Sequence, residues 1–381
     1  MVPELRRDFN RRFTPAKYSR FLAELEARAG TQIHFRNAET PCFFPRPLID
    51  KMVRYGRELL AQLSTPEYLA ASAASIPAEY NVPGESSHPL FVQADFGIDA
   101  SGEPKLVEIQ GFPSLYAYQP VLAQTYRDVY GLAPDLRSVL IDGDYTALLR
   151  NAILGDCDPE NVILMEVEPY QQKTLPDFLL TEKQYGAKIV SLTDIRKQGN
   201  RLFYGDDVPI HRIYNRVIVD ELVRKKIQPP FDFRDHLDVQ WAGHPNWYFR
   251  ISKFSIPYLR HECVPKTWFL NQLQEPPEDL DRYVLKPLYS FAGLGVIIGP
   301  TREQVAAANP DNFILQEKID FAPVIETPCG PTKAEVRIMY VWIDQPEAVT
   351  TIVRMGRGAM MGVDHNRDLE WVGASAGFVA D

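Results

Sequence analysis

Apolar residues recur every three to four positions in three stretches of the first 80 residues, as they do on the buried face of a helix. This spacing predicts helices over residues 18–28, 47–63 and 66–74. Residues 1–13 carry an arginine cluster without an apolar core segment, so we expect no secretory signal. A transit peptide is one interpretation of these arginines. A solvated helix fits better, because Glu4 and Asp8 interrupt the cluster.

Two apolar runs, residues 90–98 and 105–109, flank a glycine-containing turn and predict a β-hairpin. Asp95 lies on its first strand, and Glu108 and Gln110 share one face of its second strand. Two carboxylates and an amide oxygen are hard ligands that suit Mg²⁺ and its phosphate partners. The alternative is a polar hairpin that faces solvent.

Short apolar runs at residues 161–167, 187–192 and 211–219 predict strands, and residues 175–185 form an amphipathic helix that ends at a glycine. Strand–helix–strand order at this spacing requires a crossover between parallel strands. We therefore expect an open α/β unit with a parallel sheet at about residues 150–240.

The strand predicted at residues 211–219 carries a set of polar side chains that suit a carboxylate ligand: Arg212, Tyr214, Asn215 and Arg216. Ligands of open parallel sheets bind at the carboxyl ends of the strands, so this set is a candidate substrate clamp. The alternative places Arg212 and Arg216 on the surface as solvated charges.

The last third of the chain has the pattern of an α+β, mostly antiparallel unit. Its predicted strands cover residues 283–287, 296–298, 313–316, 335–342 and 348–354, with a helix at 301–308. The whole chain is thus expected to combine α+β and α/β architecture. The expected units span residues 1–125, 150–240 and 245–381.

Lys286 ends an apolar strand, and Ser290, Gly293 and Gly295 follow in the next turn. Small residues let backbone N–H groups approach phosphate oxygens, and a strand-anchored lysine adds positive charge. The turn is neither a Walker A loop nor a dinucleotide fingerprint, because it lacks Gly-Lys-Ser/Thr and precedes a strand. A second lysine, Lys253, precedes it. The alternative is a plain hairpin turn.

The predicted strand near residue 315 becomes polar at its C-terminal end. The backbone of this end could hydrogen-bond the edge of a purine base, and its residues are Gln316, Glu317, Lys318 and Ile319. The alternative is an ordinary strand exit. Arg337 and Arg354 lie within apolar strands, where a charge is costly to bury unless it meets an anion. One such arginine is usually ion-paired, but several near a lysine-bearing loop favour an anion site.

Composition sets the broad class of the protein. Of the 381 residues, 45% are hydrophobic and 24% are charged, which is typical of a globular protein. The formal net charge of −9 argues against binding to duplex nucleic acid. No apolar run is long enough for a membrane span. Four dispersed cysteines lack zinc spacing and fit a reducing cytoplasm. Cys263 stands near His261, either as a thiol nucleophile or, more simply, as a packed thiol.

Taken in order, these motifs resemble the ATP-grasp superfamily. The match runs from Lys253 through Val-Pro-Lys-Thr, the Val-Leu-Lys-Pro strand with its glycine loop, Leu-Gln-Glu-Lys-Ile and Glu-Val-Arg to Ile-Val-Arg-Met. Over this C-terminal block, the motifs most resemble those of glutathione synthetase. The hairpin comes last in ordinary ATP-grasp enzymes but precedes the lysines here, which resembles circularly permuted members such as glutathionylspermidine synthetase. The resemblance covers residues 91–377 by motifs.

The resemblance implies a circularly permuted ATP-grasp fold that uses ATP and Mg²⁺. It assigns Mg²⁺ to Asp95, Glu108 and Gln110, ATP phosphates to Lys253 and Lys286, a phosphate loop to residues 290–295, adenine to residues 316–319, and the transferred phosphoryl group to Arg337 and Arg354. Three positions depart from the family pattern. Gln110 stands where asparagine is usual, Gln93 where arginine is usual, and Phe291 enlarges the glycine loop. No cysteine–histidine amidase domain accompanies the synthetase motifs.

The implied chemistry is ATP-dependent joining of a carboxylate to an amine through an acylphosphate. Such a site needs charge neutralisation and alignment more than a nucleophile. Two alternatives stay open: a non-catalytic nucleotide-binding homologue, favoured by Gln93 and Gln110, and a phosphotransferase that stops at a phosphorylated product. The expected partners are a small-molecule acid and amine, without nucleic acid or membrane, and a homo-oligomer stays open.

Overall fold

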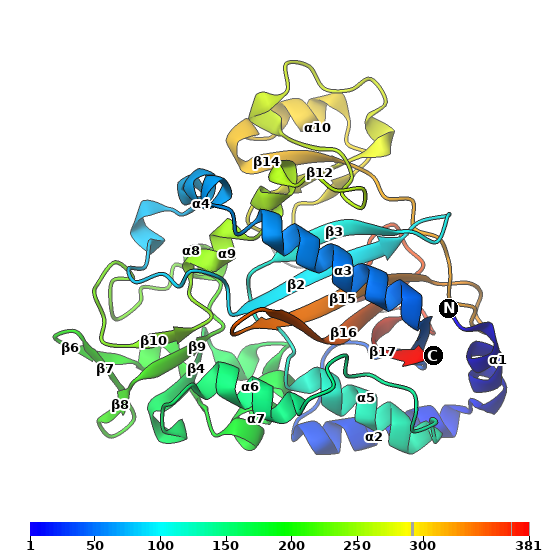
Figure 1. The fold of residues 1–381 in the computed structure, drawn as a ribbon, viewed down its shortest axis with the longest axis horizontal. Helices are drawn as coiled ribbons and strands as arrows, with labels where there is room; N and C mark the ends of the chain where they lie inside the picture. The colour runs from blue at the N-terminus through cyan, green and yellow to red at the C-terminus, as the bar shows by residue number, and fades with distance from the viewer. Residues whose placement is uncertain (291–292, 367, 381) are drawn as a thin grey trace.

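A computed structural model describes residues 1–290, 293–366 and 368–380, which form a mixed α+β architecture containing four β-sheets (Figure 1). The largest, here called the central sheet, has the order β1-β17-β16-β15-β2-β3. Its strands are β1 (Cys42–Pro45), β2 (Phe91–Ile98), β3 (Pro104–Gln110), β15 (Lys333–Trp342), β16 (Pro346–Gly356) and β17 (Gly373–Ala380). All neighbours are antiparallel except β1 and β17. The central sheet therefore joins both ends of the chain.

Strand β2 alternates between apolar and polar residues, although all eight of its residues are buried. Val92, Ala94 and Phe96 belong to a hydrophobic cluster that includes residues of α3 (Arg46–Gln62). Figure 1 shows α3 lying across β2, β3 and β15. The intervening residues Gln93 and Asp95 face the other side, because successive side chains of a strand alternate between faces. A buried polar surface therefore lies on the sheet face opposite α3.

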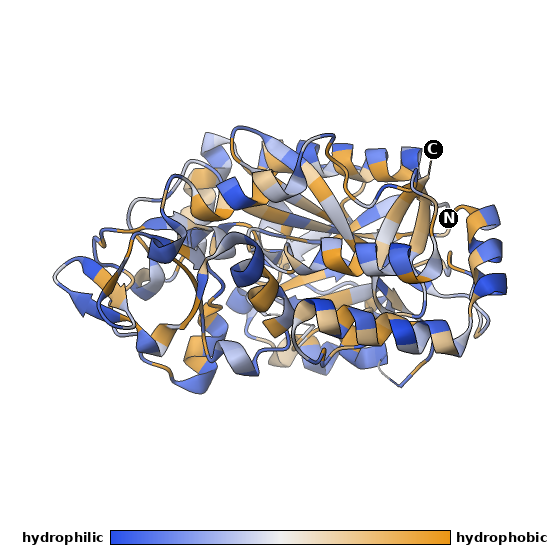
Figure 2. Ribbon diagram, turned by 90° about the horizontal axis from the view of Figure 1, so that it is seen from below, coloured by the Kyte–Doolittle hydropathy of each residue, from blue (hydrophilic) through white to orange (hydrophobic). Residues whose placement is uncertain are grey.

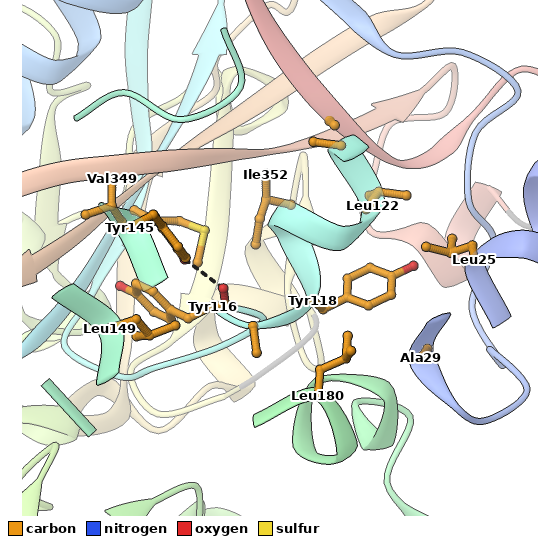
Figure 3. Close-up of a cluster of buried hydrophobic side chains, with 14 of the residues drawn as sticks. Leu25, Ala29, Tyr116, Tyr118, Leu122, Tyr145, Leu149, Leu180, Val349 and Ile352 are labelled. Carbon is orange, nitrogen blue, oxygen red and sulfur yellow. Dashed lines mark hydrogen bonds between the residues drawn. The ribbon is translucent and has the colours of Figure 1, made fainter. Parts of the chain in front are cut away.

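A second hydrophobic cluster packs helices against the face of the central sheet opposite α3. Its helices are α2 (Pro15–Ala29), α5 (Tyr118–Tyr130), α6 (Tyr145–Leu154) and α7 (Leu175–Tyr185). Figure 2 shows helices with both hydrophilic and hydrophobic residues, as amphipathic packing requires. In Figure 3, Tyr118, Leu122 and Ile352 meet in this cluster, and the Tyr145 hydroxyl donates to the Tyr116 carbonyl at 2.7 Å.

The expected α/β unit is present as a four-stranded parallel sheet in the order β10-β9-β4-β5. Its strands are β4 (Val162–Glu166), β5 (Lys188–Ser191), β9 (Arg212–Asn215) and β10 (Gln240–Ala242). The run predicted as one strand at 211–219 is shorter, because β9 ends at Asn215 and helix α8 (Val219–Lys225) begins at the end of the run. A small antiparallel sheet extends this unit: β6 (Arg196–Gln198), β7 (Arg201–Tyr204) and β8 (Val208–Ile210).

A fourth sheet, here called the upper sheet, lies at the top of Figure 1 with the order β11-β14-β12-β13. Its strands are β11 (Thr267–Phe269), β12 (Tyr283–Pro287), β13 (Ile297–Ile298) and β14 (Phe313–Glu317). Helix α10 (Arg302–Ala307) begins with a capping box between Thr301 and Gln304. The upper sheet is antiparallel, as the sequence predicts.

The remaining α-helices of the described residues are α1 (Pro3–Arg12), α4 (Pro66–Ser72) and α9 (Asn246–Arg250), and short 3₁₀ helices lie between the elements. Helix α1 is solvated on one side, where Arg7 pairs with Glu4 and Arg11 with Asp8. Arg6 is buried instead and lies over the Phe9 ring. Across the described ranges, no helix combines the length and apolar character needed to cross a membrane.

Candidate functional site

Arg337 and Asp95 form the centre of the polar face of the central sheet. They stand directly opposite each other on β15 and β2, and Asp95 also stands opposite Glu108 on β3. Arg337 Nε donates to Asp95 Oδ1 at 2.5 Å and Nη2 to Oδ2 at 2.6 Å, while Nη1 donates to Gln93 Oε1 at 2.7 Å. Such bidentate, charge-assisted bonds are strong and directional. Strand register thus places this pair, which is separated by 242 positions in sequence.

Arg354 adds a second guanidinium beside Asp95. Its Nη1 donates to Asp95 Oδ2 at 2.8 Å and also to Glu335, its opposite partner on β15. Burial raises the pKa of Asp95, but Arg337 and Arg354 outweigh it and hold that pKa below its usual value. Burial dominates for Glu335 and raises its pKa. Sequence reasoning missed Glu335, although its place two residues before Arg337 in an apolar strand was the available signal.

Lys286 reaches the hairpin from the upper sheet. Val107 lies at a register shift in the β2–β3 pairing, and Lys286 Nζ donates to its carbonyl at 3.0 Å. Nζ also donates to Gln316 Oε1 at 2.5 Å. The ammonium is almost fully buried, and desolvation lowers the pKa of Lys286 to about 8. Gln316 Nε2 is buried without a hydrogen-bond partner among the described residues.

Lys253 lies next to the same place, on a 3₁₀ turn (Lys253–Tyr258) rather than on an exposed helix. Its side chain is only 9% exposed, and Nζ lies 3.6 Å from Glu108 Oε2. Nζ donates to the Ser290 carbonyl at 2.6 Å, which ties this lysine to the glycine loop. The Ser290 hydroxyl is buried and has no hydrogen-bond partner among the described residues.

Charge accumulates where these side chains meet. Four cations, on Lys253, Lys286, Arg337 and Arg354, surround three carboxylates, on Asp95, Glu108 and Glu335. With every group ionised, one positive charge is in excess. Buried charge is stabilised by opposite charge, so this cluster is suited to an anion.

The predicted Mg²⁺ ligands do not all fit a metal. Both Asp95 oxygens accept arginine N–H groups, and Asp95 is 1% exposed. The Gln110 amide lies 3.0 Å from Arg337 Nη1. Glu108 fits better: it is 25% exposed, and its nearest cations lie at 3.5 and 3.6 Å. Within the described ranges, no group of three or more histidine, cysteine, aspartate or glutamate side chains has metal-binding geometry.

The glycine loop follows β12. Gly293 and Gly295 have positive φ angles of 75° and 73°, a region that glycine adopts without the steric cost of a side chain. A Cβ atom on Gly293 would lie 2.7 Å from Met360 Cε, so a segment after β16 covers this loop. Phe291, the bulky departure from the family pattern, lies outside the described residues.

The predicted adenine segment leaves β14 along the edge of the upper sheet. Glu317 N–H donates to the Lys266 carbonyl at 2.8 Å, and Lys318 N–H donates to the Arg282 carbonyl at 2.8 Å. Gln316 instead turns its side chain toward Lys286. Ile319 follows at the strand exit. The segment therefore begins at the buried lysine and ends near the surface.

The predicted substrate clamp divides into two parts. Arg212, at the start of β9, donates to the Ile153 and Ala152 carbonyls at 2.9 and 3.0 Å, near the end of α6. This arginine therefore holds the α/β unit together. Tyr214 is buried against Phe91, with ring centroids 5.4 Å apart, and the Asn215 side chain accepts from Val217 N–H.

Arg216 lies at the carboxyl end of the parallel sheet, as the clamp prediction requires. Its guanidinium lies between the Phe112 and Phe178 rings, 5.3 and 5.2 Å from their centroids. Arg216 is 3% exposed, and its Nε and Nη1 have no hydrogen-bond partner among the described residues. Nearby Glu166, which the sequence did not single out, has its pKa raised to about 8 by burial, against the opposing charge of Arg216.

Cys263 and His261 lie side by side next to strand β3, where the Cys263 carbonyl accepts from Leu106 N–H at 2.7 Å. Cys263 Sγ lies 3.0 Å from His261 Nδ1, whose Nε2 is 2.9 Å from Glu58 Oε2. The thiol is 1% exposed, and burial raises the pKa of Cys263 to about 12. This geometry fits a packed, protonated thiol rather than a nucleophile.

Comparison with known proteins supports the fold. No protein-family profile matches the sequence, and no curated protein matches it. A similar solved structure is that of a glutathione synthetase-like effector from Globodera pallida in its apo form. The two share 12% sequence identity, with a TM-score of 0.63 over 96% of each chain. The chain therefore has the fold of this glutathione synthetase-like protein across nearly its whole length.

Proposed function

We propose that this protein is an ATP-dependent carboxylate–amine ligase with a circularly permuted ATP-grasp fold. The observation that supports this proposal best is the meeting of four cations at the hairpin. Lys253 and Lys286 lie beside Glu108 and Val107, and Arg337 and Arg354 bond Asp95, which leaves one positive charge in excess. A nucleoside triphosphate is an anion that such a cluster would attract. The order of hairpin and lysines in the sequence supports the permuted form of the fold.

In the proposed reaction, the acid's carboxylate oxygen attacks the γ-phosphorus of ATP and ADP leaves. The amine then attacks the acylphosphate carbon and phosphate leaves, so an amide, ADP and phosphate are formed. Lys253 and Lys286 would hold the phosphate chain, and Arg354 would face the transferred group. Only Nη1 of Arg354 is bonded within the described ranges, which leaves its other donors for an anion. Mg²⁺ would supply further charge neutralisation, and Glu108, the more exposed of the two hairpin carboxylates, would meet it.

The acid substrate would bind at Arg216. Its two unbonded N–H groups lie beside the loop that follows the hairpin, because Phe112 of that loop packs on the guanidinium. The Tyr116 hydroxyl bonds the Val92 carbonyl of β2, which couples this loop to the polar face of the central sheet. A carboxylate on Arg216 would therefore sit beside the proposed phosphate site.

Calorimetry with a non-hydrolysable ATP analogue tests the nucleotide site. Incubation with ATP and mixtures of acids and amines then tests the reaction, which must release phosphate together with an amide. Phosphorylated product without amide would identify the phosphotransferase alternative. Nucleotide binding without any turnover would identify a non-catalytic homologue, which the engagement of Arg337 by Asp95 and Gln93 favours. No nucleotide binding would reject the proposal.

A further inference from the structure

The oxygen atoms expected to hold a metal all face one guanidinium. Arg337 reaches both Asp95 oxygens at 2.5 and 2.6 Å, Gln93 Oε1 at 2.7 Å and Glu108 Oε1 at 3.5 Å. The Gln110 amide completes the ring at 3.0 Å. The guanidinium therefore occupies the centre of the polar group in which the sequence predicts Mg²⁺.

Backbone register builds this arrangement. Arg337, Asp95 and Glu108 form one row across β15, β2 and β3, because each is the direct partner of the next. Side chains directly opposite on one sheet face lie close together whatever their rotamers. Arg337 and Asp95 are 5% and 1% exposed, so solvent does not separate them. Moving Arg337 away would leave a buried carboxylate with part of its partners lost, which is strongly unfavourable.

Space and charge both oppose a metal at Asp95. Mg²⁺ needs oxygen ligands at about 2.0–2.1 Å, and it binds them without intervening N–H groups. Arg354 Nη1 donates a third hydrogen bond to Asp95, to Oδ2 at 2.8 Å. The cluster already has one positive charge in excess, so a divalent ion would add to the repulsion.

We propose that Arg337 is a built-in substitute for a divalent cation at Asp95. Asp95 is then a positioning residue for Arg337 and Arg354 and not a metal ligand. The same guanidinium also donates to Gln93, so Arg337 bonds both polar side chains of β2 from the neighbouring strand. The inference concerns the site of the proposed function but rests on metal binding without nucleotide, so it can fail while the ligase activity holds.

The test is a Mn²⁺ titration of the full-length protein without nucleotide, followed by electron paramagnetic resonance of free Mn²⁺. We expect the wild type and Asp95→Asn to bind Mn²⁺ equally, because Asp95 holds no metal ion in the wild type. Arg337→Met is expected to bind one Mn²⁺ at least tenfold more tightly than the wild type. The double variant Arg337→Met with Asp95→Asn should lose this gain. Arg357→Met is the matched control, because Arg357 bonds Thr332 and the Glu370 carbonyl instead of a carboxylate.

Two results would overturn the inference. One is Mn²⁺ binding by the wild type that Asp95→Asn abolishes. The other is a folded Arg337→Met protein, shown by its near-ultraviolet circular dichroism, that gains no Mn²⁺ site. Comparison of the wild type with Asp95→Asn decides the question even where Arg337→Met does not fold. Nucleotide affinity, measured separately by calorimetry, reports on the proposed function and not on this inference.

Discussion

Lys286 Nζ donates to the Val107 carbonyl at 3.0 Å, although the two residues are 179 positions apart. Val107 lies where the β2–β3 register shifts next to Asp95, on the edge strand of the central sheet. This bond joins the early hairpin to the upper sheet. Any ligand of Lys286 must therefore also lie beside Glu108, the next residue after Val107.

Glu108→Gln is expected to lower the proposed ATP turnover by roughly 100-fold or more, because it removes the partly exposed hairpin carboxylate that would meet a metal–nucleotide complex. Phosphate release at saturating ATP measures the effect. Glu103→Gln is the control on the same hairpin, since Glu103 pairs with Lys51 near the surface. Unchanged turnover in Glu108→Gln would remove the hairpin from the chemistry.

Lys286→Met is expected to weaken nucleotide binding roughly 10- to 100-fold, the range for losing one charged hydrogen-bond donor. Calorimetry with an ATP analogue checks this, with Lys105→Met as the control on β3. The pKa of Lys286 is lowered to about 8, so its charge is present below pH 8 and lost above it. Wild-type affinity should therefore fall as pH rises through 8. If the nucleotide affinity of Lys286→Met fell with pH as steeply as that of the wild type, the titrating group would not be Lys286.

Glu166→Gln is expected to change how stability depends on pH. Burial raises the pKa of Glu166 to about 8 in the folded protein, above its usual 4.5. A raised folded pKa gives stability that is complete below pH 4.5 and lost as pH rises through 8. The wild type should lose on the order of a few kcal/mol relative to Glu166→Gln across this window. Urea unfolding at pH 5 and pH 8 measures it, with Glu160→Gln as the exposed control.

Gly97→Ala is expected to destabilise the protein by about 1–3 kcal/mol, the range for overpacking a filled site. A Cβ at Gly97 would lie 2.6 Å from two ring atoms of Phe321, which is held beside the hairpin by a bridge to Asp99. Gly143→Ala is the control, because nothing lies within 4 Å of its Cβ position. Equal urea midpoints for the two variants would contradict the contact.

Local pattern predicted most individual elements of the fold. The helix predicted at 175–185 is α7, the strand at 283–287 is β12, and the hairpin at 90–109 differs from β2 and β3 by about one residue. These elements are encoded by alternation, helical spacing and turn residues within one segment. Strands β1 and β17 were not predicted: β1 has only four residues, and the two strands pair with each other across most of the chain.

The sequence by itself determined which side chains could carry charge on the polar face of β2, because strand alternation is a local property. Its pattern also singled out two lysines and two arginines as candidates for an anion site. Only the tertiary structure decided their partners. Arg337 forms an ion pair with Asp95, and Arg212 donates hydrogen bonds to backbone carbonyls near the end of α6. Strand register and helix packing set those contacts between residues far apart in the chain, and no local pattern carries that information.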